Sequence, residues 1–256
     1  MFELLFIAVI QGITEFLPIS SSGHITVAGA LFDIEYSLFM IIWLHASSLA
    51  AVITYYFKDL LLIARDFILL LLKQENREGP LAIQLVGATA VTGVIGLFLK
   101  DFLENEISFT IVGLMLIATA GLIYLAESLR RYTRGGSFNW VHTGLVGIAQ
   151  GLAVFPGLSR SGTTITYLIG AGLERKEAVR ISFLLSIPTI GGTLALGLLD
   201  SENLALAITP TYILIFIVGF ITSLVSIKLM NMWVEKYWKL FIPYCLILGV
   251  LVLFIL

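Results

Sequence analysis

Charged residues are scarce in this chain. Asp, Glu, Lys and Arg together make up 12% of the 256 residues, about half of the roughly 25% that is usual in a soluble domain. The formal net charge is only −2, so composition gives no reason to expect nucleic acid as a partner. The single cysteine, Cys245, excludes a disulfide framework and a cysteine-based metal site.

Long polar stretches are also missing. The two longest, residues 73–79 and 127–140, are no larger than loops. Residues 1–17 lack a basic start and contain two polar side chains, Gln11 and Glu15, so they do not have the pattern of a cleaved signal peptide. We therefore expect a single membrane domain over the whole chain, residues 1–256.

Apolar residues are abundant instead. They make up 59% of the chain, and the mean hydropathy is +1.01, so a soluble fold of this size could not bury its apolar surface. A membrane-crossing helix needs about 20 mostly apolar residues. Six segments meet that requirement: 38–57, 81–99, 107–126, 178–199, 212–230 and 239–256.

Two further apolar stretches, 2–17 and 141–156, are too short or too interrupted to cross. Each leads into a turn rich in Ser, Gly and Pro, and a second short apolar piece follows, near 25–32 and 164–173. Because irregular backbone at membrane depth must be surrounded by protein or line a cavity, we interpret both as re-entrant helical hairpins. Residues 60–72 cannot span, and we expect them to form an interfacial helix.

The basic residues fix the expected orientation. With six crossings and two hairpins that do not cross, thirteen Lys and Arg side chains fall on one face, and only Lys100 falls on the other. The positive-inside rule makes the first face cytoplasmic and places both termini outside. Glu15 and Arg160 belong to neither face. The thirteen are Lys58, Arg65, Lys73, Arg77, Arg130, Arg131, Arg134, Arg175, Lys176, Arg180, Lys228, Lys236 and Lys239.

The two hairpins are related by an internal repeat. Residues 11–24 align with 150–163 without gaps at an offset of 139, and six of the fourteen positions are identical. Three crossings separate the copies, so the second must be inverted relative to the first. Inverted repeats with broken helices that meet near the midplane are typical of transporters with a central site. Such a meeting would bring Glu15 close to Arg160.

The predicted fold class is therefore an all-α polytopic membrane protein. It has six transmembrane helices plus two re-entrant helical hairpins, arranged as an inverted repeat of approximately residues 1–126 and 139–256.

The hairpin turns carry groups suited to an anion. Each turn places hydroxyls and free backbone N–H groups at a helix start, where the helix dipole favours negative charge. Arg160 adds a planar guanidinium suited to phosphate oxygens. Gln11 and Glu15 lie four residues apart and share a helix face. A divalent cation between Glu15 and a phosphate would remove their repulsion, and His24 could relay a proton near neutral pH.

Structural roles for the same residues stay open at this point. Glu15 and Arg160 could be an ion pair that locks the hairpins together, and Ser20, Ser22 and Ser161 could cap helices. We interpret His45, inside the first crossing, as a packed polar residue.

Three motifs carry a family resemblance: QGITE (11–15), LPISSSGH (17–24) and PGLSRSGTT (156–164). With them the chain resembles the bacitracin-resistance family, the undecaprenyl-diphosphate phosphatases, over its whole length. The resemblance implies a plasma-membrane hydrolase that converts undecaprenyl (polyprenyl) diphosphate to the monophosphate and inorganic phosphate. It implies dependence on Mg²⁺ or Ca²⁺, an active site facing outside, and recycling of a lipid carrier for cell-envelope glycan synthesis.

The resemblance also implies roles for individual residues. Glu15 would bind the metal or act as a base, assisted by Gln11. Ser21 or His24 would be the nucleophile, with Ser21 favoured because a serine needs an adjacent base. Arg160 would clamp the diphosphate.

Further phosphate-binding residues are implied on the second hairpin, namely Ser159, Ser161 and Thr164. The expected partners are the polyprenyl diphosphate and membrane lipids, with no nucleic acid, and a homodimer is left open. The alternative function is a membrane transporter or lipid flippase, because this architecture also serves transport.

Overall fold

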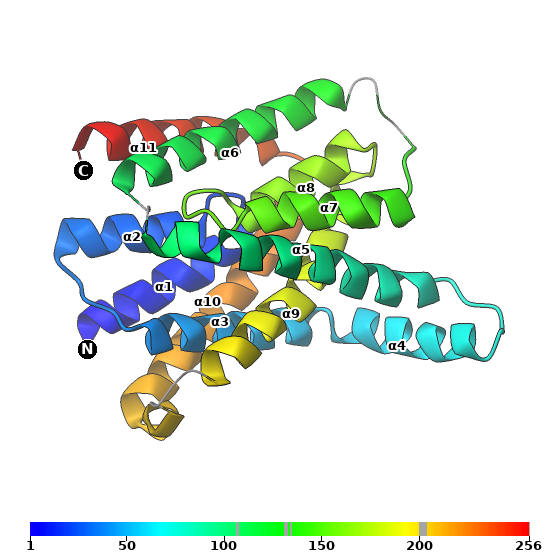
Figure 1. Cartoon of the computed structure of the whole chain (residues 1–256), viewed down its shortest axis with the longest axis horizontal. Coiled ribbons are helices and arrows are strands. Elements are labelled where there is room, and N and C mark those ends of the chain that lie inside the picture. Colours follow the sequence, from blue (N-terminus) through cyan, green and yellow to red (C-terminus); the bar gives the residue numbers. More distant parts are fainter. Residues whose placement is uncertain (106–107, 131–132, 134, 200–203, 256) are drawn as a thin grey trace.

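The structure is a computed structural model that describes residues 1–105, 108–130, 133, 135–199 and 204–255. Within these residues the chain forms helices and no strand, as the sequence predicts (Figure 1). The elements are α1 (Phe2–Phe16), α2 (Ser21–Phe32), α3 (Leu38–Tyr55), α4 (Phe57–Leu71), α5 (Gly79–Asn105), α6 (Phe109–Leu129), α7 (Trp140–Leu152), α8 (Arg160–Gly170), α9 (Arg175–Leu199), η1 (Leu204–Ile208), α10 (Pro210–Trp233), η2 (Trp238–Leu240) and α11 (Phe241–Ile255).

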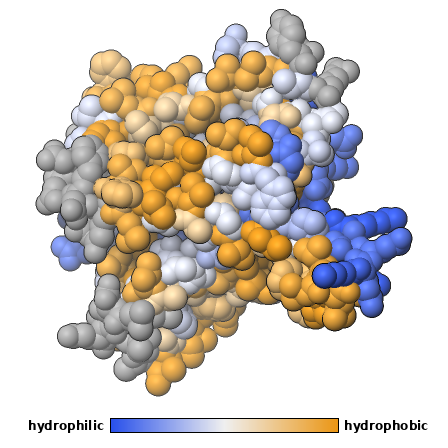
Figure 2. Space-filling model, turned by 45° about the vertical axis from the view of Figure 1, so that its right-hand side comes forward, coloured by the Kyte–Doolittle hydropathy of each residue, from blue (hydrophilic) through white to orange (hydrophobic). Residues whose placement is uncertain are grey.

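Six helical segments in the described residues are long and apolar enough to cross a membrane. They lie on α3, α5, α6, α9, α10 and η2–α11 and match the six predicted crossings, which are thereby confirmed. Residues 107 and 256, at the ends of two predicted crossings, lie outside the described residues. Large apolar side chains such as Phe98 and Phe254 are exposed, and hydrophobic residues cover most of the face in Figure 2. This surface suits contact with lipid.

The two hairpins are built alike. α1 and α2 have 15 and 12 residues, α7 and α8 have 13 and 11, and at about 1.5 Å per residue none is long enough to cross alone. The first residue before each second helix is a serine cap: Ser20 accepts a hydrogen bond from the Gly23 amide, and Ser159 accepts one from the Gly162 amide. These pairs are related by the offset of 139, and the geometry is compatible with re-entrant hairpins.

Helix packing is reciprocal between the halves. α1 packs against α10 of the other half, and α7 packs against α5 in the same way. The pair α3–α10 has its counterpart in α9–α5, and α6 pairs with α11. Gly12 and Gly151, again 139 apart, both sit at these contacts with no room for a β-carbon. The packing is compatible with the predicted inverted repeat.

The two termini lie at the same end of the molecule, opposite the C-terminal ends of α4 and α6 (Figure 1). This agrees with a topology that puts both termini on one face. The predicted interfacial segment forms α4, which packs along α5. The loop between them is tied back by Asp66, whose carboxylate accepts hydrogen bonds from the Arg77 and Glu78 amides. Those two bonds hold the pKa of Asp66 below its usual range.

The hairpin turns are embedded in the main hydrophobic core. Phe16, Leu17 and Ile19 of the first turn are buried in the same cluster as Ile165 and Phe183. The rings of Phe16 and Phe183 meet edge to face, 5.1 Å apart. Because these apolar side chains are packed in the core, the polar residues next to them in the turns are held in fixed positions.

Candidate active site

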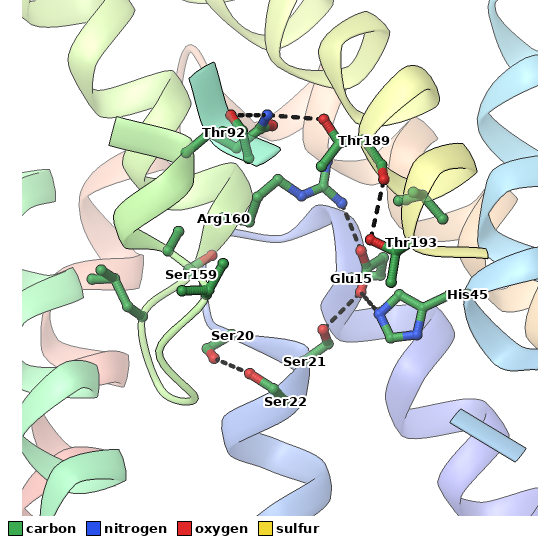
Figure 3. Close-up of a pocket in the computed structure, with 15 residues that line it drawn as sticks. Glu15, Ser20, Ser21, Ser22, His45, Thr92, Ser159, Arg160, Thr189 and Thr193 are labelled. Carbon is green, nitrogen blue, oxygen red and sulfur yellow. Dashed lines mark hydrogen bonds and ion pairs between the residues drawn. The ribbon is translucent and has the colours of Figure 1, made fainter. Parts of the chain in front are cut away.

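Glu15 is the centre of a buried polar cluster between the two hairpin turns (Figure 3). Its side chain is almost completely buried. One carboxylate oxygen lies 2.6 Å from Arg160 Nη2, and the other accepts hydrogen bonds from Gln11 Nε2 at 2.8 Å and from Ser21 Oγ at 2.7 Å. Contact between residues 145 positions apart confirms the expectation that the turns bring Glu15 to Arg160.

The local sequence explains why these groups converge. α1 ends because Leu17, before Pro18, is extended, as residues before proline usually are. Ser20 then takes a positive φ of 68° and caps α2. Ser21 and Arg160 are the first residues of α2 and α8. They are therefore equivalent in the repeat, and both bind the same carboxylate.

A cavity of about 300 Å³ opens beside this cluster. Several buried polar atoms in and around it have no hydrogen-bond partner among the described residues: Arg160 Nη1, Gln11 Oε1 and Gln150 Oε1. Unpaired buried polar groups are costly, so such atoms indicate a place for a polar ligand. The residues that line the cavity are Glu15, Ser20, Ser21, Ser22, His45, Thr92, Gln150, Ala153, Val154, Leu158, Ser159, Arg160, Thr189, Ile190 and Thr193.

The predicted phosphate-binding residues of the second turn separate into two groups. Ser159 and Arg160 line the cavity. Ser161 does not; its hydroxyl donates to the Leu17 carbonyl oxygen and joins the two turns. Thr164 is fully buried, where its hydroxyl lies 2.6 Å from that of Ser182. In this structure Ser161 and Thr164 brace the turn.

His24 points away from the cavity, although the sequence places it beside Ser21. Its Nδ1 lies 2.7 Å from the Ser20 carbonyl oxygen, so Nδ1 carries the proton and donates. Its Nε2 is left to accept from the Tyr244 hydroxyl at 2.6 Å, and the two rings stack. The structure thus brings Ser21, and not His24, to Glu15.

His45 is a site residue that the sequence reasoning missed. It lines the cavity, with Nε2 at 3.9 Å from Glu15 and 3.5 Å from Gln11 Nε2. Its Nδ1 donates to the Ile41 carbonyl oxygen at 2.8 Å, which fixes the ring. The available signal was its position inside a crossing, because ionisable residues there are usually functional.

Gln150 was matched to Gln11 by the repeat but was given no role. Its amide donates to the hydroxyls of Thr92 at 3.0 Å and Thr189 at 2.9 Å. Thr92 and Thr189 lie at the end of the cavity opposite Ser20 and Ser22, with Arg160 and Glu15 between them (Figure 3). The repeat alignment could have identified Gln150, but no sequence signal singled out the two threonines.

The donor atoms at the site fit a hard cation only in part. No group of three His, Cys, Asp or Glu side chains that could hold a metal occurs among the described residues. Of the described residues that line the cavity, Glu15 alone offers a carboxylate. The amide oxygen Oε1 of Gln11, whose Nε2 donates to Glu15, has no hydrogen-bond partner among the described residues. Mg²⁺ is commonly held by one or two carboxylates together with substrate phosphates, so these residues fit a cation that the substrate helps to bind.

Comparison with known proteins gives a consistent picture. Residues 4–251 match the family model described as bacitracin resistance protein BacA. An undecaprenyl-diphosphatase of Methanosphaera stadtmanae is 38% identical, covering 94% of this chain and 93% of that protein. One from Thermosipho africanus is 32% identical, covering 97% and 98%. Undecaprenyl-diphosphatase 1 of Shouchella clausii is 38% identical, covering 98% and 94%.

Proposed function

The chain belongs to the bacitracin resistance protein BacA family, and from this premise we propose that it is a multi-pass membrane undecaprenyl-diphosphatase. It hydrolyses undecaprenyl diphosphate to the monophosphate and inorganic phosphate and so recycles the lipid carrier used in cell-wall synthesis. The observation that carries the proposal to the residue level is the single carboxylate, Glu15, that binds both the Ser21 hydroxyl and the Arg160 guanidinium.

Ser21 is the nucleophile in this proposal. Its Oγ attacks the terminal phosphorus while Glu15 accepts the hydroxyl proton, as the 2.7 Å hydrogen bond prepares it to do. The bond from phosphorus to the bridging oxygen breaks, and the lipid monophosphate leaves with that electron pair and takes the proton from Glu15. The oxygen of a water molecule then attacks the phosphorus of the phosphoserine while Glu15 accepts a proton from the water. The bond from Ser21 Oγ to phosphorus breaks, Oγ leaves with that electron pair and takes the proton from Glu15, and inorganic phosphate is released.

Arg160 binds the phosphoryl groups. Its Nη2 is used by Glu15, whereas its Nη1 is buried and has no partner among the described residues. A phosphate oxygen in the cavity would accept a hydrogen bond from Nη1. The positive charge of the guanidinium would then stabilise the negative charge that develops on the phosphoryl oxygens. Ser159, at the same helix start, adds a hydroxyl on the cavity wall.

A divalent cation, Mg²⁺ or Ca²⁺, belongs to the proposal. Glu15 and the amide oxygen of Gln11 would hold it together with the diphosphate, and it would supply neutralisation of phosphate charge. Its presence would also explain how a carboxylate can line a site for an anion.

The proposed location is the plasma membrane, with both termini and the active site facing outside. The excess of basic residues on the opposite face supports this orientation. A homodimer stays a prediction that light scattering of the purified protein can test. The transporter alternative is not favoured, because the three relatives compared above are named as undecaprenyl-diphosphatases.

The test is phosphate release by the purified protein from undecaprenyl diphosphate, with and without EDTA. We expect release that stops in excess EDTA and returns with added Mg²⁺ or Ca²⁺. Full turnover in the chelator would remove the cation from the proposal. Complete absence of release under all conditions, with lipid movement across vesicles, would favour transport instead.

A further inference from the structure

A second cavity, of about 500 Å³, lies between α6, α7 and α8 on the side of the second hairpin. Its walls are mostly apolar and include Leu122 and Leu125 of α6 and Leu152 of α7. We call it the α6–α8 groove. Leu158 lines both this groove and the polar cavity around Glu15, so the two spaces share a wall at the tip of the hairpin.

The groove follows the length of α8, away from the hairpin tip. Leu158 lies just before α8 begins, and Gly170, its last residue, lines the far part of the groove. Eleven helical residues correspond to roughly 16 Å of path. At the far end, His142 Nδ1 lies within hydrogen-bond distance of the Tyr167 hydroxyl, at 2.8 Å. These two polar groups therefore bond to each other where they line the groove.

In the first hairpin, the described residues at the equivalent positions make different contacts. The positions equivalent to Thr163 and Thr166 are His24 and Val27. His24 stacks on Tyr244 of α11, and Val27 packs against the cluster of Val112, Leu116 and Val252. These two contacts occupy positions that line the groove in the second hairpin, so the two halves differ in side-chain packing here.

We propose that the α6–α8 groove binds the polyisoprenoid chain of the substrate, with the isoprene units nearest the diphosphate at Leu158. The inference rests on the proposed function. Arg160, which would hold the diphosphate, is two residues from Leu158, where the apolar groove begins. Binding of the polyisoprenoid chain in the groove keeps its apolar surface away from water and from the polar cavity. The volume of the groove is within the usual range of ligand pockets.

Matched tryptophan variants test the proposal. Leu152→Trp and Leu125→Trp narrow the groove from α7 and α6. Ile148→Trp and Leu114→Trp are the controls, because these residues lie on the same two helices, are similarly exposed, and do not line the groove. Each protein is assayed with a C55 and a C5 isoprenyl diphosphate. The C5 compound carries the same diphosphate and almost no chain.

We expect the two groove variants to raise the KM for the C55 substrate about tenfold, which corresponds to about 1.4 kcal/mol of lost binding. Turnover of the C5 substrate stays within about twofold of the unchanged protein, and the control variants change neither. Unchanged KM for C55 in both groove variants would overturn the proposal and would leave the groove to membrane acyl chains.

A second measurement covers variants that lose activity on both substrates. A C55 diphosphate analogue with a photoreactive group on its first isoprene units is crosslinked to the unsubstituted protein, and the attachment sites are mapped by mass spectrometry. Attachment to α6, α7 or α8 along the groove supports the proposal, and attachment confined to other helices overturns it. Failure of the proposed function differs from both outcomes, because the unsubstituted protein would then release no phosphate from either substrate.

Discussion

At the scale of single residues, the site depends on one buried carboxylate with several partners. Burial of the Glu15 charge alone would be costly. That cost is offset by hydrogen bonds from Arg160, Ser21 and Gln11. Removal of one member of a buried ion pair leaves the other charge unpaired, at a cost of about 3–5 kcal/mol. Simple loss of activity on mutation therefore does not separate catalysis from folding, and conservative substitutions are needed.

Arg160→Lys is the first such test. Lysine keeps the positive charge, so the pair with Glu15 can form and the protein should fold. Lysine has no equivalent of the guanidinium Nη1, the nitrogen that we assign to the phosphate. We expect phosphate release to fall on the order of 10²-fold, with unchanged thermal unfolding of the detergent-solubilised protein. Arg77→Lys, in an exposed loop, is the control, and near-full activity of Arg160→Lys would remove Arg160 from phosphate binding.

Ser21→Ala and His24→Asn together test the choice of nucleophile. We expect Ser21→Ala to lose nearly all turnover, at least on the order of 10³-fold, because the attacking oxygen is gone. His24→Asn should retain a larger fraction, since His24 faces Tyr244 and not the cavity. Acid quenching during turnover, followed by mass spectrometry, should find phosphate on Ser21. Phosphate on His24, or a more severe loss in His24→Asn, would contradict this assignment.

The same residues explain what sequence could and could not predict about the site. The repeat and the two buried charges predicted that Glu15 meets Arg160, because inversion brings the turns together. The direction of a side chain depends on its neighbours in space, however. His24 is drawn away by Tyr244 and His45 is directed inward by the Ile41 carbonyl oxygen, and neither contact has a signature in the local sequence.

At the scale of helices, close backbone approach at glycine holds the hairpins to the crossing helices. A β-carbon on Gly12 of α1 would lie 2.8 Å from the Gly219 carbonyl oxygen of α10 and would overlap the Thr222 hydroxyl. Small residues at such contacts are a general device of membrane helices. The position of α1, and through it that of Glu15, therefore depends on this contact.

Gly12→Ala tests this dependence. Alanine favours a helix over glycine by about 1 kcal/mol, yet forced separation of α1 from α10 should destabilise the protein by about 1–3 kcal/mol. We expect a lower thermal midpoint and reduced phosphate release. The matched control is Gly121→Ala on α6, where a β-carbon meets nothing and stability should stay equal or rise. Equal thermal midpoints and equal phosphate release in the two variants would show that the position of α1 does not depend on this contact.

Helix identity was predictable because membrane crossings have a simple rule of length and hydropathy. The rule works for α10 and for the span that ends with α11, which have the highest mean hydropathies of the six spans. It does not set exact ends. The predicted interfacial helix 60–72 begins earlier, as α4 (Phe57–Leu71), and directly follows α3. Its start depends on packing near Tyr56, which is buried in the core, and composition does not record such packing.

At the scale of the whole molecule, a nearly symmetric scaffold carries asymmetric chemistry. Glu15 of the first half is matched by Val154, and Ser21 is matched by Arg160. Beside α8, Thr163 and Thr166 line the groove, whereas His24 and Val27 at the equivalent positions of α2 stack on Tyr244 and pack against Val112, Leu116 and Val252. Each half thus supplies what the other lacks: the first gives a carboxylate and a hydroxyl, and the second gives a guanidinium and an apolar groove. The complete site requires both halves in opposite orientation.

The last prediction therefore concerns orientation in the membrane. Both termini lie at one end of the molecule (Figure 1), and the basic residues predict that this end is outside. Ser137→Cys and Glu35→Cys introduce exposed thiols in loops that flank the second and the first hairpin. The native Cys245 is fully buried, so it should give little background labelling.

In intact cells an impermeant maleimide should label Glu35→Cys, whereas it should label Ser137→Cys only after permeabilisation. Labelling of both from the same side would contradict the inverted repeat, because three crossings separate the hairpins. The reverse pattern would keep the repeat but contradict the proposed orientation, because both termini would then lie on the cytoplasmic side.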